Sequence, residues 1–226
     1  MKVDNPPSAE NWSRMQHPEV AATSNDIFKF LKGRPQFTYE AFRRTTRYRI
    51  HDRIVLEHAL RINSEFGSEL GRKHNEDAIR AFFQFEESHP IEGLPIFAEV
   101  IEHYPLSRDC RIPIKPVSVI REDGRFVPVF VIPWTQWAFD DFQASLYLTI
   151  LDRSIFTLTD FEDSQAKILF LPRFGLNKDA PRTPVLWSRD QFPLLSDNDF
   201  ADQIRVYWEG RDSAVQRYND YLASRA

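Results

Sequence analysis

The sequence contains little cysteine and little glycine, and each shortage excludes a class of site. Cys110 is its single cysteine, so neither a disulfide within the chain nor a thiolate zinc site can form. This usage is typical of a reducing compartment, and we expect a cytoplasmic protein. Only seven glycines occur in 226 residues, and none belongs to a phosphate-binding loop or a dinucleotide-binding fingerprint. No serine lies in a nucleophile elbow, so nucleotide-dependent and α/β-hydrolase chemistry are not indicated.

Long apolar runs and a strong net charge are missing as well. No apolar stretch reaches the roughly 18 residues of a membrane span, and no signal-peptide pattern opens the sequence. We therefore expect no membrane partner. The net charge of −4 predicts no bulk attraction to nucleic acid. Aromatic residues, at 14%, either fill the core or line a site that stacks on bases or apolar ligands, and we favour the core.

The clearest structural pattern lies at residues 111–137. Asp123-Gly124 stands between two runs of β-branched and aromatic residues, which is the strongest short-range signal for a hairpin. A two-residue turn places Glu122 opposite Arg125, an attractive pair, whereas a three-residue turn would place Arg121 opposite Arg125. We therefore predict the two-residue turn.

Both faces of this hairpin are apolar, so we expect both to be covered. One face carries Ile120, Val127, Val129 and Val131; the other carries Val117, Val119, Phe126, Phe130 and Ile132. Prolines also fit the predicted register. Pro113 and Pro128 fall where their nitrogens point to an outer edge, and Pro116 and Pro133 should end or bulge the pairing. We favour protection of the edges over a docking edge for a partner strand.

The remaining sequence is read mostly as helix. We predict a helix at residues 24–32, capped by Ser24 or Asn25, and a broken helix from Thr38 to about residue 65. A third helix is capped by Asn75 and ended by Pro90, and a short helix begins at Pro95. Residues 135–152 fit a helix or a strand, and their length favours a helix. Residues 154–159, 167–171 and 185–187 are predicted strands. A C-terminal helical segment begins at Ser196 and is expected to kink or divide at Gly210.

These elements predict an α+β fold. A helical N-terminal half and C-terminal helices should pack around a small, mostly antiparallel sheet centred on the 111–137 hairpin. Residues 1–23 are polar and without periodicity, which indicates a mobile N-terminal arm. Trp12 and Met15 are the residues through which it would pack on the body or on another subunit. Residues 24–226 are expected to form a single domain, with a sub-boundary, if any, near residues 105–108.

The first candidate site is basic. Residues 26–56 contain eight Lys or Arg residues against three acids, with Tyr48 among the interleaved rings. Such cations neutralise phosphates, and neighbouring rings stack on bases. The cations are Lys29, Lys32, Arg34, Arg43, Arg44, Arg47, Arg49 and Arg53. No nucleic-acid-binding module is recognisable, and we favour a solvated helix face paired with acids such as Glu57, Glu65 and Glu69.

The second candidate site is acidic. Asp160, Glu162 and Asp163 lie in a predicted loop before Lys167, and clustered carboxylates bind Mg²⁺ or Mn²⁺ for phosphodiester hydrolysis. A nuclease would require an acid two residues before the lysine, where this chain has Gln165. We therefore favour a polar turn and expect no cofactor, unless the hydrolase hypothesis holds.

Histidine and cysteine give weaker signals. His51 and His58 are seven residues apart, too far for adjacent metal ligation on a helix, and His74, His89 and His103 are scattered. Nothing local marks Cys110 as activated, so we interpret it as a small buried hydrophobe rather than a nucleophile.

Three functions follow. We favour a non-enzymatic binding or assembly protein, a subunit of a larger intracellular complex that contacts a protein partner or further copies of itself. The alternatives are a nucleic-acid-binding protein that uses the 26–56 face and a metal-dependent nuclease or hydrolase that uses residues 160–163. If both charged stretches lined one cleft, an enzyme acting on nucleic acid would be favoured. If they lay on opposite faces, a charge-complementary assembly surface would be favoured.

Overall fold

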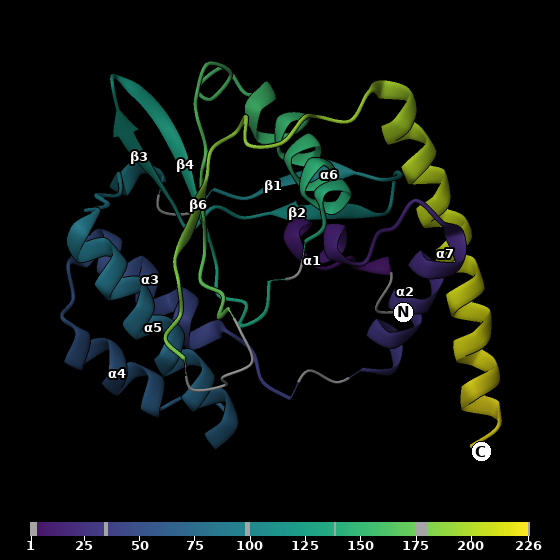
Figure 1. Cartoon of the computed structure of the whole chain (residues 1–226), viewed down its shortest axis with the longest axis horizontal. Coiled ribbons are helices and arrows are strands. Elements are labelled where there is room, and N and C mark those ends of the chain that lie inside the picture. The colour runs from purple at the N-terminus through teal and green to yellow at the C-terminus, as the bar shows by residue number, and fades with distance from the viewer. Residues whose placement is uncertain (1–3, 34–35, 98–99, 138, 175–179, 226) are drawn as a thin grey trace.

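The computed structural model describes residues 4–33, 36–97, 100–137, 139–174 and 180–225, and it has the predicted α+β architecture (Figure 1). Its α-helices are α1 (Ala9–Arg14), α2 (Val20–Lys32), α3 (Glu40–Asp52), α4 (Leu56–Ser64), α5 (Glu69–Ser88), α6 (Asp141–Asp152) and α7 (Asp197–Ala223). Short 3-10 helices are η2 (Pro95–Phe97) and η3 (Ile155–Thr157). Its strands are β1 (Glu102–Pro105), β2 (Arg111–Ile114), β3 (Ser118–Glu122), β4 (Arg125–Ile132), β5 (Lys167–Phe170) and β6 (Val185–Trp187). No helix in the described ranges is long and apolar enough to cross a membrane.

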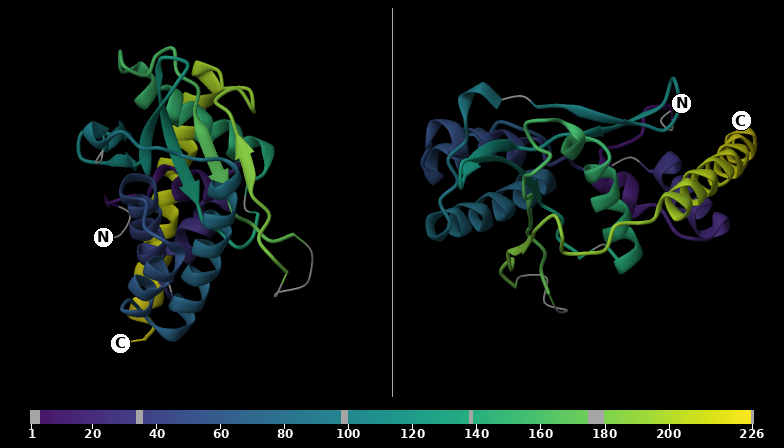
Figure 2. Two further views of the ribbon diagram at one scale, coloured as in Figure 1. Left: turned by 90° about the vertical axis from the view of Figure 1, so that its left-hand side faces the viewer. Right: turned by 90° about the horizontal axis from the view of Figure 1, so that it is seen from above.

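A four-stranded sheet with the strand order β3-β4-β5-β6 forms the centre of the fold. β4 and β5 are parallel and the other neighbours are antiparallel, so the sheet is mixed but mostly antiparallel. Helix α6 lies in the crossover between the two parallel strands, as such connections require. Figure 2 shows the helices α3, α4 and α5 at one end of the molecule and the long α7 with α2 at the other.

The hairpin register is confirmed. Glu122 pairs with Arg125 and Ile120 with Val127, around a two-residue turn. Asp123 and Gly124 have φ values of 47° and 80°, as a type I′ turn demands at both central positions. Glycine adopts this conformation without cost, and aspartate tolerates it better than most residues.

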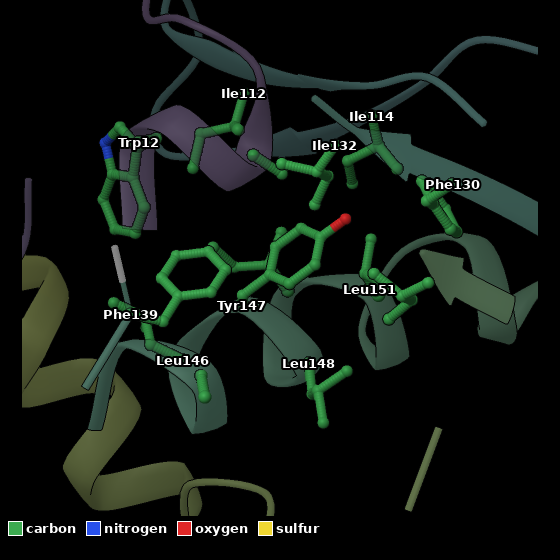
Figure 3. Packing of buried hydrophobic residues seen from close by; sticks show 14 of the residues in the cluster. Trp12, Ile112, Ile114, Phe130, Ile132, Phe139, Leu146, Tyr147, Leu148 and Leu151 are labelled. Atoms are coloured by element: carbon green, nitrogen blue, oxygen red, sulfur yellow. The ribbon is translucent and has the colours of Figure 1, made fainter. Parts of the chain in front are cut away.

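Both faces of the sheet are covered, as predicted, by two separate apolar clusters. On one face α6 packs its buried Tyr147 and Leu151 toward β2 and β4 (Figure 3). On the other face α3 and α5 contribute Phe42, Ile79 and Phe82. One assignment was wrong: Val117, just before β3, packs with the second cluster and not with the first.

Two strand predictions are corrected. Residues 111–114 do not extend the hairpin, because β2 pairs with β1 in a separate two-stranded sheet, in which Pro113 faces His103. Residues 154–159 are not a strand but contain η3, because Ser154 continues the turns of α6 through hydrogen bonds to the carbonyls of Ile150 and Leu151. The strands predicted at 167–171 and 185–187 and the helix within 135–152 are present.

Helix α7 is continuous through Gly210. A Cβ atom there would lie 3.1 Å from Thr23 Cγ2 and 3.2 Å from the backbone nitrogen of Ser24, so the glycine lets α2 approach closely. Ser24 does not cap α2, which begins at Val20; its hydroxyl bonds to Ser213 across the same contact, 3.1 Å away. Ser196 caps α7 as expected, accepting from the backbone N–H of Asp199.

The segment before α2 is tied into the body. Trp12 of α1 is completely buried in the first apolar cluster. Gln143 of α6 donates to the carbonyls of Arg14 (2.9 Å) and Gln16 (3.0 Å), and Gln203 of α7 donates to that of His17. Helix α2 runs from Val20 past residue 23, which was the expected boundary between the N-terminal arm and the domain. Residues 105–108, the expected sub-boundary, lie at the end of β1 and in the turn that leads to its partner β2.

Asn75 does not cap its own helix. Ser68 caps α5, and neither Thr38 nor any other side chain caps α3 locally. Instead Asn75, buried within α5, accepts from the N–H of Phe42 (2.8 Å) and donates to the carbonyl of Thr38 (2.8 Å). A residue of one helix therefore completes the N-terminus of another.

We predict that Asn75→Ala lowers the free energy of unfolding by about 1–3 kcal/mol, because it leaves the buried N–H of Phe42 without an acceptor. Chemical denaturation monitored by circular dichroism measures the change. The matched control is Asn219→Ala on the exposed surface of α7, expected within about 0.5 kcal/mol of wild type. Equal effects of the two substitutions would contradict the capping role.

Candidate functional site

The basic stretch is divided between structure and surface. Arg49 and Arg53 turn toward Glu86 of α5, whose side chain is only 2% exposed. Arg49 Nε lies 2.8 Å from Glu86 Oε2 and Arg53 Nη1 lies 2.6 Å from Oε1. These two cations therefore neutralise a buried carboxylate and join α3 to α5.

The remaining nucleic-acid candidates are dispersed along α3. Arg43 is exposed and 3.5 Å from Glu10 of α1, and Arg44 lies over the ring of Phe66. Arg47 and Tyr48 are half-buried. Arg34 lies outside the described residues. The acids that pair with the described part of this stretch include Asp26 for Lys29 of α2, Glu10 for Arg43, and Glu86 and Glu92 for Arg53.

The acidic residues form no metal site among the described residues. Asp160, Glu162 and Asp163 are all exposed in the loop before β5. Their loop is held through backbone carbonyls, with Arg189 donating to Glu162 (2.8 Å). Lys167 pairs with Glu122 of the hairpin and not with these acids.

The two charged stretches lie apart. In Figure 1 the connection before β5, which holds the acids, lies at the top of the view, while α3 lies at the left against the lower part of the sheet. Neither the acids nor the cations of α3 line the narrow crevice or the open groove that are described below. The two stretches therefore do not line one of these pockets together.

The histidines and the cysteine have packing roles. His74 stacks on Phe37 at 4.4 Å and His89 on Phe85 at 4.5 Å, and His51 bonds to Ser118. Cys110 is buried; burial raises the pKa of its thiol and a hydrogen bond with Tyr207 offsets this only in part. A raised pKa leaves less thiolate at neutral pH, which opposes a nucleophilic role.

An aromatic surface that the sequence patterns did not indicate lies beyond the carboxyl ends of β4 and β5. We define it by Trp134, Trp137 and Phe174. Trp137 and Phe174 are 38% and 52% exposed. Trp134 and Trp137 line a crevice that is too narrow to admit a water molecule. Its lining comprises Trp134, Gln136, Trp137, Phe139, Phe170 and Pro172.

Trp137 is held in place by neighbouring rings. Its ring centroid lies 5.3 Å from those of Phe170 and Trp187 and 6.4 Å from that of Phe174. Phe170 and Trp187 are buried strand residues, so the scaffold of the sheet positions the exposed ring. The single sequence signal for this surface is the density of Trp and Phe after each strand, which fits a core equally well.

A buried arginine supports the same end of the sheet. The side chain of Arg182 is completely buried, and its guanidinium donates to the carbonyls of Pro133 and Leu171, each at 2.8 Å. It also pairs with Asp77 of α5, which Arg173 approaches to 2.7 Å. Arg182 therefore fixes the segments that follow β4 and β5 to α5.

An open polar groove of about 480 Å³ lies between the end of α6 and the start of α7. Its charged side chains already pair with one another or with adjacent residues. Asp152 lies 2.5 Å from Arg189, and Arg153 lies 2.5 Å from Asp197. The groove therefore offers a ligand few free charges, and the aromatic surface is the better candidate site.

Comparison of the chain with models of known protein families, with characterised proteins and with solved structures finds no match.

We predict that Glu86→Gln lowers the free energy of unfolding by roughly 2–4 kcal/mol, because Arg49 and Arg53 lose their anionic partner. The loss should fall short of that for a fully buried group, since Arg53 is 43% exposed. Urea denaturation provides the measurement. Glu87→Gln, at the exposed neighbouring position, is the control and should leave stability nearly unchanged. A Glu86 variant as stable as this control would show that the ion pairs contribute little.

Proposed function

We propose that the chain is a non-enzymatic binding protein that holds a partner protein on its aromatic surface, as a subunit of a larger intracellular assembly. The observation that carries this proposal is the exposure of Trp137 and Phe174, 38% and 52%, on a cluster of packed rings. Partly exposed tryptophan and phenylalanine side chains are typical anchors of protein interfaces. The free, buried Cys110 supports a reducing compartment.

The geometry supports a preorganised anchor. The rings of Phe170 and Trp187 restrict Trp137, so a partner would order few side chains on binding. A smaller entropic cost leaves more of the contact energy as affinity. The crevice beside Trp137 does not admit water, which favours contact with a protein surface over enclosure of a small molecule.

The charges support protein over nucleic acid as the partner. Arg49 and Arg53 neutralise Glu86, and the exposed Lys29 and Arg43 pair with Asp26 and Glu10. Much of the positive charge of this stretch is therefore already balanced by acids of the same chain, and the chain as a whole carries a net charge of −4. Exposed acids without a common centre give the hydrolase alternative no comparable support.

Site-specific photo-crosslinking tests this proposal. The photoreactive residue p-benzoylphenylalanine is placed at position 137, at position 174 or at position 70, where Leu70 of α5 is 43% exposed and serves as the control. We expect a discrete protein adduct in cells from positions 137 and 174 and none from position 70. An adduct of twice 26.6 kDa identifies a second copy of the chain, and another mass identifies a different protein.

A second variant shows whether the adduct depends on the anchor. Trp137→Ala in the chain that carries the photoreactive residue at 174 should weaken binding by about thirtyfold, the effect of losing a hot spot of roughly 2 kcal/mol. Circular dichroism checks that the variant is folded. Adducts that form equally from position 70, or that persist undiminished without Trp137, would overturn the proposal.

A further inference from the structure

A short strap covers the outer edge of β3. We define the strap as residues 90–94. Gly93 forms a β-bridge with Ile120, and the N–H of Leu94 donates to the carbonyl of Val119 at 2.8 Å. β3 is the terminal strand of the four-stranded sheet, so the strap pairs with an edge that would otherwise be open.

The strap meets α3 and β3 in a close-packed junction. A Cβ atom on Gly93 would overlap Ser118 Oγ and would lie 2.6 Å from His51 Cε1 and 2.7 Å from Ile50 Cγ2. The N–H of Gly93 points at the carbonyl of Ile50, 3.5 Å away. Only glycine fits at this position, and the His51 ring packs directly against it.

The junction accommodates the His51 ring better in its neutral form than in its protonated form. Its Nε2 lies 3.1 Å from the hydroxyl of Ser118, a residue that is 2% exposed. Its Nδ1 is buried and has no hydrogen-bond partner among the described residues. With the proton on Nε2, the ring donates to Ser118 and Nδ1 keeps a lone pair. A second proton would place an N–H donor on Nδ1 with no acceptor in reach.

The surrounding charges do not compensate a protonated ring. Burial is the largest effect and lowers the pKa of His51; Arg47 of the same helix lowers it further, and Asp52 opposes both. On the strap, the carboxylate of Glu92 is 88% exposed and lies 4.0 Å from Arg53. On β3, the group that faces the ring is the uncharged Ser118.

We infer that His51 is the pH-sensitive latch of the strap, and that its protonation detaches residues 90–94 from β3. Because its pKa in the folded protein is lowered from 6.5, neutral His51 stabilises the junction above that value. This stability is lost as the pH falls below 6.5 toward the lowered pKa. Detachment removes the Leu94 N–H from the carbonyl of Val119 and makes β3 an open edge strand.

Amide hydrogen exchange of the folded protein, corrected for the intrinsic pH dependence of exchange, tests the latch. We expect the protection factor of the Leu94 amide to fall by up to about tenfold for each unit of pH between 6.5 and the lowered pKa of His51, since each unit is worth about 1.4 kcal/mol. His51→Gln keeps a neutral side chain and should remove this pH dependence. His89→Gln, at an exposed position, should behave like wild type.

Nuclear magnetic resonance titration of the His51 ring in the wild-type protein gives an independent measurement. Its midpoint should lie below 6.5 and should coincide with the loss of Leu94 protection. The inference is overturned if protection of Leu94 does not change between pH 7.5 and pH 5, if the His51→Gln variant keeps the wild-type pH dependence, or if the ring titrates without opening the strap.

Discussion

Burial of β4 and β5 on both faces is the constraint on which the rest of the structure depends. A parallel pair in the middle of a sheet must be shielded on both sides, and its crossover must carry a covering element. Helix α6 covers one face, with Tyr147 and Leu146 in the core, and α3 and α5 cover the other. The two apolar clusters exist because this sheet separates them, and every other helix packs onto one of the two layers or onto a helix that does.

Polar groups then join the layers where apolar packing cannot specify position. Glu86 binds α3 to α5, Asn75 completes the start of α3, and Arg182 fixes the segments beyond β4 and β5. Each group is buried and hydrogen-bonded, so each selects one arrangement of neighbouring elements. The same rigidity sets the exposed aromatic residues at the end of the sheet, because Trp137 rests on rings that belong to β5 and β6.

The aromatic surface and the strap differ in exposure and in how firmly they are held. The aromatic surface is exposed, apolar and fixed, which suits a binding anchor. The strap is covered, polar at its latch and held by few hydrogen bonds, which suits a segment that opens. Arg49 and Arg53 of the basic stretch belong to neither surface, because they join α3 to α5 through Glu86.

The sequence alone determined the register of the β3–β4 hairpin and the position of most helices. The two-residue turn at Asp123-Gly124 and the pair of Glu122 with Arg125 involve neighbours along the chain, so their chemistry is readable without the fold. Only the tertiary structure decided that β2 pairs with β1, that Arg49 meets Glu86 and that Trp137 remains exposed. Those outcomes depend on residues far apart in the chain, and the same apolar or charged pattern is compatible with many partners until packing selects one.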